Sequence, residues 1–260
     1  MKLKQSQPSL QQVHLQKSHP PTGQMIFGEW RDGERAPIKM TRGGAVVDGN
    51  VAYFMGTNGE TCFYNSTIKR WSKLPKCLCG WSSLAVIRGI LTAIGENKLL
   101  SIVNDKDKMW VEHFRPMPTK RYGTAAVTTE QCLIVAGGMS GLSNYLNTVE
   151  VMDIQTFIWS TAASLPHPYT HASAAICGDH LYMLGGYDKD GRTKSVLTCS
   201  LTKLLQSCSE TFSDPVWRRI TDVPVYNSTC AAVNGELVAV GGVDEAVSYT
   251  HLTLPTNREV

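Results

Sequence analysis

The chain has 260 residues, a formal net charge of +3 and an apolar content of 42%, which is an ordinary composition for a globular protein. The small, dispersed charge argues against a dedicated nucleic-acid binder, which usually carries a dense basic face. No run of about 18 apolar residues occurs, so the sequence offers no candidate membrane span. We therefore expect a chain that binds neither nucleic acid nor membrane.

The N-terminal segment, residues 1–25, is rich in Gln, Ser, Pro and Lys and has no sustained hydrophobic period. Such a segment buries too little apolar surface to offset its ordering entropy, so we expect a disordered polar tail. Lys2 and Lys4 are not followed by an apolar core, and the segment does not have the pattern of a secretory signal.

Eight cysteines are scattered along the chain, and only Cys77 and Cys79 lie close together. A single C-x-C pair is a weak metal signal. We expect the cysteines to be small buried apolar residues in a reducing compartment, in preference to disulfides or metal ligands. This predicts a cytoplasmic protein.

A repeated unit dominates residues 26–245, and its best-preserved copy runs from Arg121 to Trp159. Each unit has two apolar runs separated by a polar turn such as Gly178-Asp179, then glycine, an alternating third strand and a tryptophan. Turns containing Asn-Gly or Asp-Gly supply the positive φ of tight hairpins, so each pair of runs is predicted to fold as a β-hairpin. The units recur every 40 to 55 residues or so, which is typical of β-propeller blades.

Two residue types are expected to carry the blade geometry. Tryptophan should anchor the outer strand, burying its ring between neighbouring sheets while its N–H bonds a carbonyl. Glycine after the second strand allows a sharp turn or a close approach of another backbone. These blade-structural residues are Trp30, Trp71, Trp110, Trp159, Trp217, Gly56, Gly95, Gly137, Gly138, Gly185, Gly186, Gly241 and Gly242.

The order of glycine doublet, polar-ended strand, tryptophan and Leu-Pro resembles the kelch repeat, from about Trp30 to Asp244. The resemblance implies an all-β fold, a kelch-type β-propeller of four-stranded blades that is incomplete here. About four full blades are expected, at roughly 38–74, 79–118, 120–166 and 167–224, plus a half-blade and an orphan N-terminal closing strand at Trp30. An insertion before Trp217 contains Leu201–Ser207, which could form one helical turn.

The C-terminal residues 246–260 are expected to be a non-native artefact tail. The sequence VSYTHLTLPT resembles a translated transposase adapter of the kind used in sequencing libraries, which would make the chain a truncated fragment. The alternative is a natural strand and loop, because VSYTHLTL alternates.

No catalytic or metal motif stands out, and we expect no enzyme activity, cofactor or metal. The glycine doublets follow strands but precede no helix, unlike a phosphate-binding loop. His167 and His171 flank a strand start and are expected to be exposed loop residues. The alternative class is a carbohydrate-acting propeller enzyme resembling galactose oxidase or a sialic-acid mutarotase. The resemblance to these enzymes is in architecture only.

A binding surface is the sharper expectation, because the loops of a propeller gather on one face around the central channel. Tyr and Arg are enriched in interface hot spots. The candidate partner-binding residues are Arg121, Tyr122, Tyr169, His171, Tyr187 and Tyr226. Three of the tyrosines, at 122, 169 and 226, stand two to four residues after a proline and are interpreted as matching positions; the alternative is that each packs against its own blade. The resemblance implies an adaptor or scaffold that binds another protein, such as a ubiquitin-ligase or cytoskeletal component.

Overall fold

The computed structural model divides the chain into two units, Met1–Glu34 and Arg35–Val260, and every residue whose structure is described belongs to the second. The described residues are 35–39, 44–56, 58–79, 83–103, 109–113, 115–141, 143–223, 229–233, 235–240 and 251–254. The predictions for the tail 1–25, Trp30, Tyr226, Gly241 and Gly242 lie outside these residues.

Five antiparallel sheets, here named blades A to E in chain order, make up the described part of the chain. Blade A contains β1 (Gly44–Asp48), β2 (Val51–Met55), β3 (Thr61–Asn65) and β4 (Arg70–Leu74). Blade B contains β5 (Ser83–Ile87), β6 (Ile90–Gly95), β7 (Lys98–Val103) and β8 (Met109–Glu112). Blade C contains β9 (Ala125–Thr128), β10 (Cys132–Ala136), β13 (Val149–Asp153) and β14 (Trp159–Ala162).

Blade D contains β15 (Ser173–Cys177), β16 (His180–Leu184), β19 (Ser195–Ser200) and β20 (Arg218–Asp222), and blade E contains β21 (Thr229–Val233), β22 (Glu236–Val240) and β23 (His251–Leu254). Two small hairpins are inserted, β11 (Met139–Ser140) with β12 (Asn144–Tyr145) and β17 (Tyr187–Asp188) with β18 (Gly191–Arg192). The helix α1 (Leu201–Gln206) confirms the predicted helical turn.

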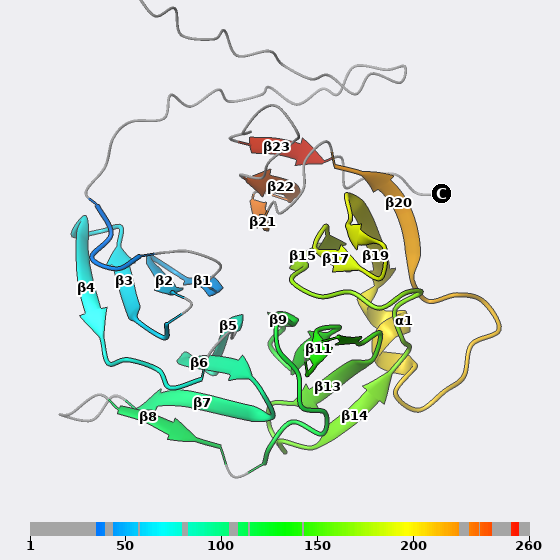
Figure 1. Ribbon diagram of the computed structural model, residues 1–260, viewed down its shortest axis with the longest axis horizontal. Helices are drawn as coiled ribbons and strands as arrows, with labels where there is room; N and C mark the ends of the chain where they lie inside the picture. Colours follow the sequence, from blue (N-terminus) through cyan, green and yellow to red (C-terminus); the bar gives the residue numbers. More distant parts are fainter. Residues whose placement is uncertain are drawn as a thin grey trace, which may run out of the picture. The chain divides into compact units, whose positions relative to one another are not determined.

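The blades follow one another around a centre, with the first strand of each blade innermost (Figure 1). β5 lies between β1 and β9, and β15 lies between β9 and β21. The predicted all-β propeller arrangement with four complete blades is therefore confirmed. Central strands of the best-preserved blades are covered on both faces, and β10 is buried along its whole length, as expected for a continuous apolar run.

The tryptophans take the predicted place in each outer strand. Trp71, Trp110 and Trp159 pair with the third strand of their own blade, and Trp217 directly precedes β20. The indole Nε1 of Trp110 donates to the carbonyl of Pro75 at 2.8 Å, and that of Trp217 donates to the carbonyl of Ala163 at 3.0 Å. Each of these two bonds links a blade to the end of the preceding one, so the predicted anchoring role is confirmed for them.

The strand pairing corrects the register of the glycines. Gly56, Gly95, Gly137 and Gly185 each follow the residue that pairs with the start of the first strand. Gly95 therefore corresponds to Gly137, the first glycine of its doublet, and not to Gly138, the last. The place of the second glycine in blade B is taken by Glu96, which keeps a left-handed φ of 56°.

The second glycine of each doublet permits a close backbone approach. A Cβ on Gly138 would lie 2.8 Å from the carbonyl oxygen of Tyr122, and one on Gly186 would lie 2.5 Å from that of Thr170. Real Cβ atoms do not come this close to a backbone oxygen, and both glycines have a positive φ, at 98° and 89°. The requirement for glycine here is therefore steric as well as conformational.

Blade E differs from the prediction. The sequence led us to expect only two strands, but β23 pairs antiparallel with β22, from Leu237↔Leu254 to Val240↔His251. An alternating segment can add to the free edge of a strand, and this alternation was the reason for the alternative interpretation of the C-terminal residues.

The cysteines confirm the prediction of small apolar core residues. No disulfide joins them, and six are buried; these are Cys62, Cys77, Cys79, Cys132, Cys177 and Cys199. Burial raises the pKa of the Cys77 thiol to about 11, so the thiol stays protonated and weakly reactive at neutral pH.

Candidate protein-interaction face

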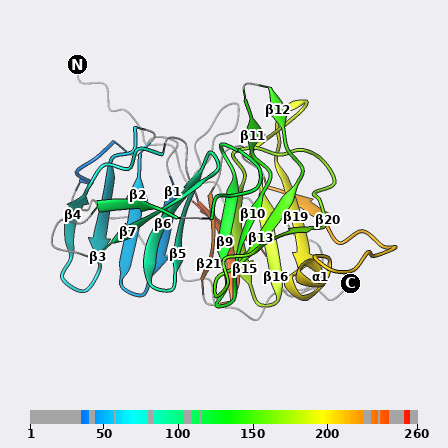
Figure 2. The same ribbon diagram turned by 90° about the horizontal axis from the view of Figure 1, so that it is seen from below.

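One end of the blades, here called the loop face, carries both the connections between second and third strands and the segments that link one blade to the next. Backbone bridges join the two kinds of segment: Glu96 pairs with Arg121, Tyr122 with Met139, and Thr170 with Tyr187. The hairpin of β11 and β12 projects from this end, and α1 lies at the opposite end (Figure 2). The loops gather on one face as expected for a propeller.

Arg121 does not lie on the surface of this face, which corrects its assignment as a partner-binding residue. Its side chain has no exposed surface. Nη1 donates to the carbonyls of Gly137 at 2.9 Å and Thr148 at 3.1 Å, and Nη2 lies 3.0 Å from Oε2 of Glu150. Burial lowers the pKa of the guanidinium, and the nearby carboxylate opposes that shift. Arg121 therefore holds blade C together from within.

Tyr169 is also buried, with 5% of its surface exposed, so the alternative of packing against its own blade holds for this residue. Its hydroxyl lies 3.4 Å from Oγ of Ser195 on β19. The strand pairing also corrects the matching of tyrosines: Tyr122 and Thr170 form equivalent bridges, so Tyr169 corresponds to Arg121. The sequence match relied on residue type: Tyr122 lies four residues after Pro118, but Tyr169 lies only three after Pro166, and the residue four after Pro166 is Thr170.

Three of the predicted residues do come together at the junction of blades C and D. The ring of His171 meets the ring of Tyr187 edge-on, with centroids 6.0 Å apart, and its Nδ1 lies 3.1 Å from Oγ1 of Thr170. The backbone N–H of His171 donates to the carbonyl of Gly123, beside Tyr122. His171 has a positive φ of 54° and is half-buried, which corrects the expectation of an exposed loop residue; His167 is exposed as predicted.

We name Lys120, Tyr122, His171 and Tyr187 the loop-face cluster. Nζ of Lys120 lies 5.8 Å from the centre of the Tyr122 ring, within the range of a cation–π contact. Tyr122, His171 and Tyr187 are half-buried, so each keeps some exposed surface while its backbone is fixed. Such rigid, partly exposed aromatic groups suit contact with another protein.

Two projecting hairpins flank the loop-face cluster. Tyr187 begins β17, and Met139, the bridge partner of Tyr122, begins β11. In blades A and B the same connection between second and third strands is short and has no hairpin. The signal in the sequence was the extra length after each glycine doublet, at residues 139–147 and 187–194, which the sequence identified as loops without predicting paired strands.

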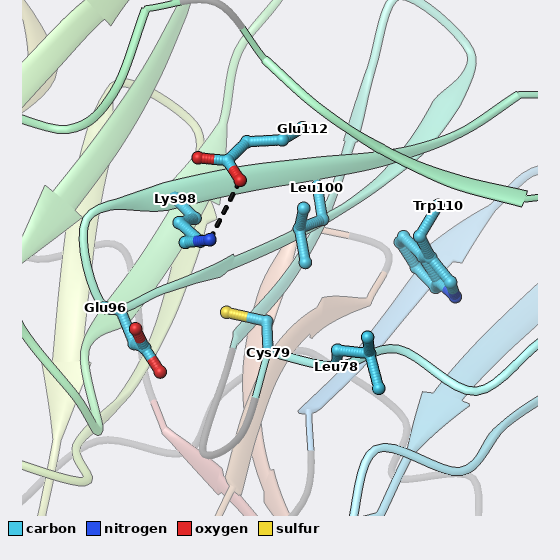
Figure 3. A pocket seen from close by; sticks show the side chains of 7 residues that line it. All are labelled: Leu78, Cys79, Glu96, Lys98, Leu100, Trp110 and Glu112. Atoms are coloured by element: carbon cyan, nitrogen blue, oxygen red, sulfur yellow. Dashed lines mark hydrogen bonds and ion pairs between the residues drawn. The ribbon is translucent and has the colours of Figure 1, made fainter.

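A pocket that the sequence did not predict lies between blade B and the segment that links it to blade A, and we call it the A–B pocket (Figure 3). Its volume is ≈ 250 Å³, and it is lined by Leu78, Cys79, Glu96, Lys98, Leu100, Trp110 and Glu112. Nζ of Lys98 lies 2.9 Å from Oε2 of Glu112, and this hydrogen bond raises the pKa of Lys98. Sγ of Cys79 donates to the carbonyl of Gly95 at 3.3 Å.

No three His, Cys, Asp or Glu side chains of the described part of the chain lie together in a way that could hold a metal ion. None of the helices found there has the length and apolar character needed to cross a membrane.

Comparison with solved structures supports the fold. The structure of YjhT superposes with a TM-score of 0.66 at 17% sequence identity, covering 81% of this chain and 74% of that one. At that identity the likeness concerns the fold alone.

Comparison with known sequences gives the family. Kelch-like protein 35 of Mus musculus is 26% identical over 70% of this chain, and the influenza virus NS1A-binding protein homolog of Xenopus laevis is 37% identical over 27% of it. The chain spans 38% of the length of the former and 11% of the latter. Residues 77–254 match the family described as the KLHDC2/KLHL20/DRC7 Kelch-repeats domain. The chain belongs to the kelch-repeat family.

Proposed function

We propose that the chain is a non-enzymatic protein-interaction module that binds a partner protein through its loop face. The observation that carries the proposal is the loop-face cluster at the junction of blades C and D, flanked by two projecting hairpins. Aromatic side chains held in place by backbone bridges lose little conformational entropy on binding, which favours affinity.

The chemistry of the loop-face cluster agrees with this role. Tyr122 and Tyr187 each combine an apolar ring with a hydroxyl, and Lys120 adds a charge over one of the rings. Interfaces concentrate their binding energy in a few such residues, surrounded by polar groups that exclude water. Family membership is consistent with the role, and one relative is named for binding another protein, the influenza virus NS1A protein. An adaptor or scaffold role in the cytoplasm, for example with a ubiquitin-ligase or cytoskeletal partner, is the form of this function that the family resemblance implies.

The proposal is tested by comparing three forms of the chain in quantitative affinity capture from cell extract. One carries Tyr122→Ala and Tyr187→Ala on the loop face. The matched control carries Lys203→Ala and Gln206→Ala, two exposed positions on α1 at the opposite end. We expect the loop-face variant to lose about 90% or more of a specifically captured protein, because hot-spot truncations cost about 2 kcal/mol or more each. Equal capture by the unchanged chain and the loop-face variant would contradict the proposal.

An enzyme of the carbohydrate-acting class is distinguished by a different measurement. Metal analysis of the purified chain, together with a sugar-binding screen, is expected to give neither a stoichiometric metal nor a saturable sugar. A copper content near one ion per chain, or a sugar that binds and is converted, would overturn the interaction-module proposal.

A further inference from the structure

The A–B pocket occupies a place that a large side chain takes in the next two blade junctions. Cys79, Arg121 and Tyr169 are equivalent, because each lies four residues before the first strand of the following blade. Those strands start at Ser83, Ala125 and Ser173. The equivalence extends to a contact: Cys79 donates to the carbonyl of Gly95, and Arg121 donates to that of Gly137.

The two larger side chains close their junctions. Arg121 is fully buried, and its guanidinium bonds the carbonyl of Gly137, the hydroxyl of Thr148 and the carboxylate of Glu150. Tyr169 is buried with its hydroxyl beside Ser195. The fold can therefore accept either a guanidinium or a phenol at this position without a change in the surrounding strands.

The thiol of Cys79 is much smaller, and the space beside it is the A–B pocket. Its volume of ≈ 250 Å³ lies below the roughly 300–1,000 Å³ of pockets that hold whole small-molecule ligands. A pocket of this size suits one long side chain. Leu100 and Trp110 supply apolar walls that would contact the stem of such a side chain (Figure 3).

The charges of the pocket favour a cation. Two carboxylates, those of Glu96 and Glu112, line the pocket together with one ammonium group, that of Lys98. This ammonium group forms an ion pair with Glu112. The carboxylate of Glu96 has no hydrogen-bond or ion-pair partner among the described residues. A guanidinium combines strong hydrogen bonding to a carboxylate with attraction to an aromatic ring, and Trp110 lines the same pocket. Arginine thus matches the pocket better than lysine, whose ammonium is a more strongly hydrated point charge.

We propose that the A–B pocket binds an arginine side chain of a partner protein. The inference rests on the proposed function, since its ligand is part of a protein, but it concerns a site separate from the loop-face cluster. The bound arginine would occupy in the A–B junction the place that Arg121 occupies in the next junction, with Glu96 as its carboxylate partner.

The test uses the whole chain and the acetylated, amidated tripeptide Gly-Arg-Gly, followed by NMR. Titration should shift the backbone signals of Lys98 and Leu100 and the indole signal of Trp110. The same tripeptide with citrulline, which has nearly the shape of arginine but no charge, should bind about tenfold more weakly or not at all. Glu96→Gln should weaken the arginine peptide about three- to tenfold.

Variants at position 79 give an independent check. Cys79→Arg should abolish peptide binding, because it places a guanidinium in the pocket from inside, whereas Cys79→Ser should leave it unchanged. If Cys79→Arg does not fold, Glu96→Lys serves the same purpose by reversing the charge of the pocket. Equal binding of the arginine and citrulline peptides, no shift at all, or shifts outside the pocket would each overturn the inference.

The outcome is separable from the proposed function. Tyr122→Ala with Tyr187→Ala should leave peptide binding in the A–B pocket intact. Retained partner capture with no peptide binding refutes only the pocket inference. Peptide binding without capture through the loop face refutes only the proposed function.

Discussion

Arg121→Met should lower the free energy of unfolding of the chain by about 3–5 kcal/mol, the range for breaking one side of a buried ion pair. The guanidinium is fully buried, and the side chain of its partner Glu150 is 5% exposed. Without Arg121, that carboxylate keeps only the hydroxyl of Thr119 as a donor. The carbonyl of Thr148 keeps the backbone N–H of Gly137 as a donor, but the carbonyl of Gly137 loses its side-chain donor, so the substitution removes hydrogen bonds from buried polar groups.

The double variant Arg121→Met with Glu150→Leu should recover most of that loss and unfold within about 1–2 kcal/mol of the unchanged chain. Blade B supplies the precedent. Leu100 and Glu150 each lie two residues before the partner of the blade tryptophan, namely Ile102 and Met152. Blade B therefore has an apolar residue where blade C has the carboxylate, and Cys79 where blade C has Arg121.

The assay is urea unfolding of the four members of the double-mutant cycle, followed by tryptophan fluorescence and by circular dichroism. A coupling energy of about 2 kcal/mol or more between the two positions is expected from contact inside the core. The reasoning would be refuted by a loss below about 1 kcal/mol for Arg121→Met alone. It would also be refuted by a double variant no more stable than either single variant.

Three further outcomes follow from the same structure. Gly138→Ala should lower the free energy of unfolding in urea by about 2–4 kcal/mol, because the new Cβ would lie 2.8 Å from a carbonyl oxygen. Gly141 also has a left-handed φ, but a Cβ there would have nothing within 4 Å, so Gly141→Ala should lower it by only about 1–2 kcal/mol. Trp217→Phe should lower the thermal midpoint more than Trp110→Phe, because both lose an indole hydrogen bond but only Trp217 is fully buried. The Cys77 thiol has a pKa raised from 9.0 to about 11, so the stability it contributes is present below pH 9 and is lost as the pH rises toward 11, by about 1.4 kcal/mol per pH unit. Cys77→Ala should flatten that slope when urea unfolding is repeated across this pH range.

The features predicted correctly from the sequence are those that serve one purpose and recur in every blade. Tryptophan opposite the third strand and glycine after the second are each demanded by local geometry, so their spacing alone revealed the propeller. Loop tyrosines and arginines serve several purposes, and their residue type does not say which. Arg121 belongs to a type enriched at interfaces, yet its partners Thr148 and Gly137 bring it into the core, and they lie 27 and 16 residues away in the sequence.

The position of a residue relative to its strand was the quantity that the sequence did not provide. Matching tyrosine with tyrosine after the proline placed Tyr169 beside Tyr122 in the repeat. That match is off by one residue, because a shared residue type does not fix a position in the repeat, whereas strand pairing does. The A–B pocket could not be predicted for the same reason: a missing large side chain at Cys79 is visible only after the blades are aligned by their pairing.

This variable position explains how a propeller can change its surface without changing its fold. Backbone hydrogen bonds join neighbouring blades. The N–H of Arg121 donates to the carbonyl of Glu96 at 2.6 Å, and the N–H of Gly138 donates to the carbonyl of Tyr169 at 2.7 Å. Because these bonds need no particular side chain at the position before the first strand, that side chain is free to be a guanidinium, a phenol or a thiol. A small residue at this position opens a pocket. The loss of one buried side chain lowers the stability of the fold by roughly 2–5 kcal/mol, and the other contacts of the blade junction can offset this loss. The same substitution in a neighbouring junction would open a second pocket with different walls, so each junction is a separate place at which binding specificity can arise.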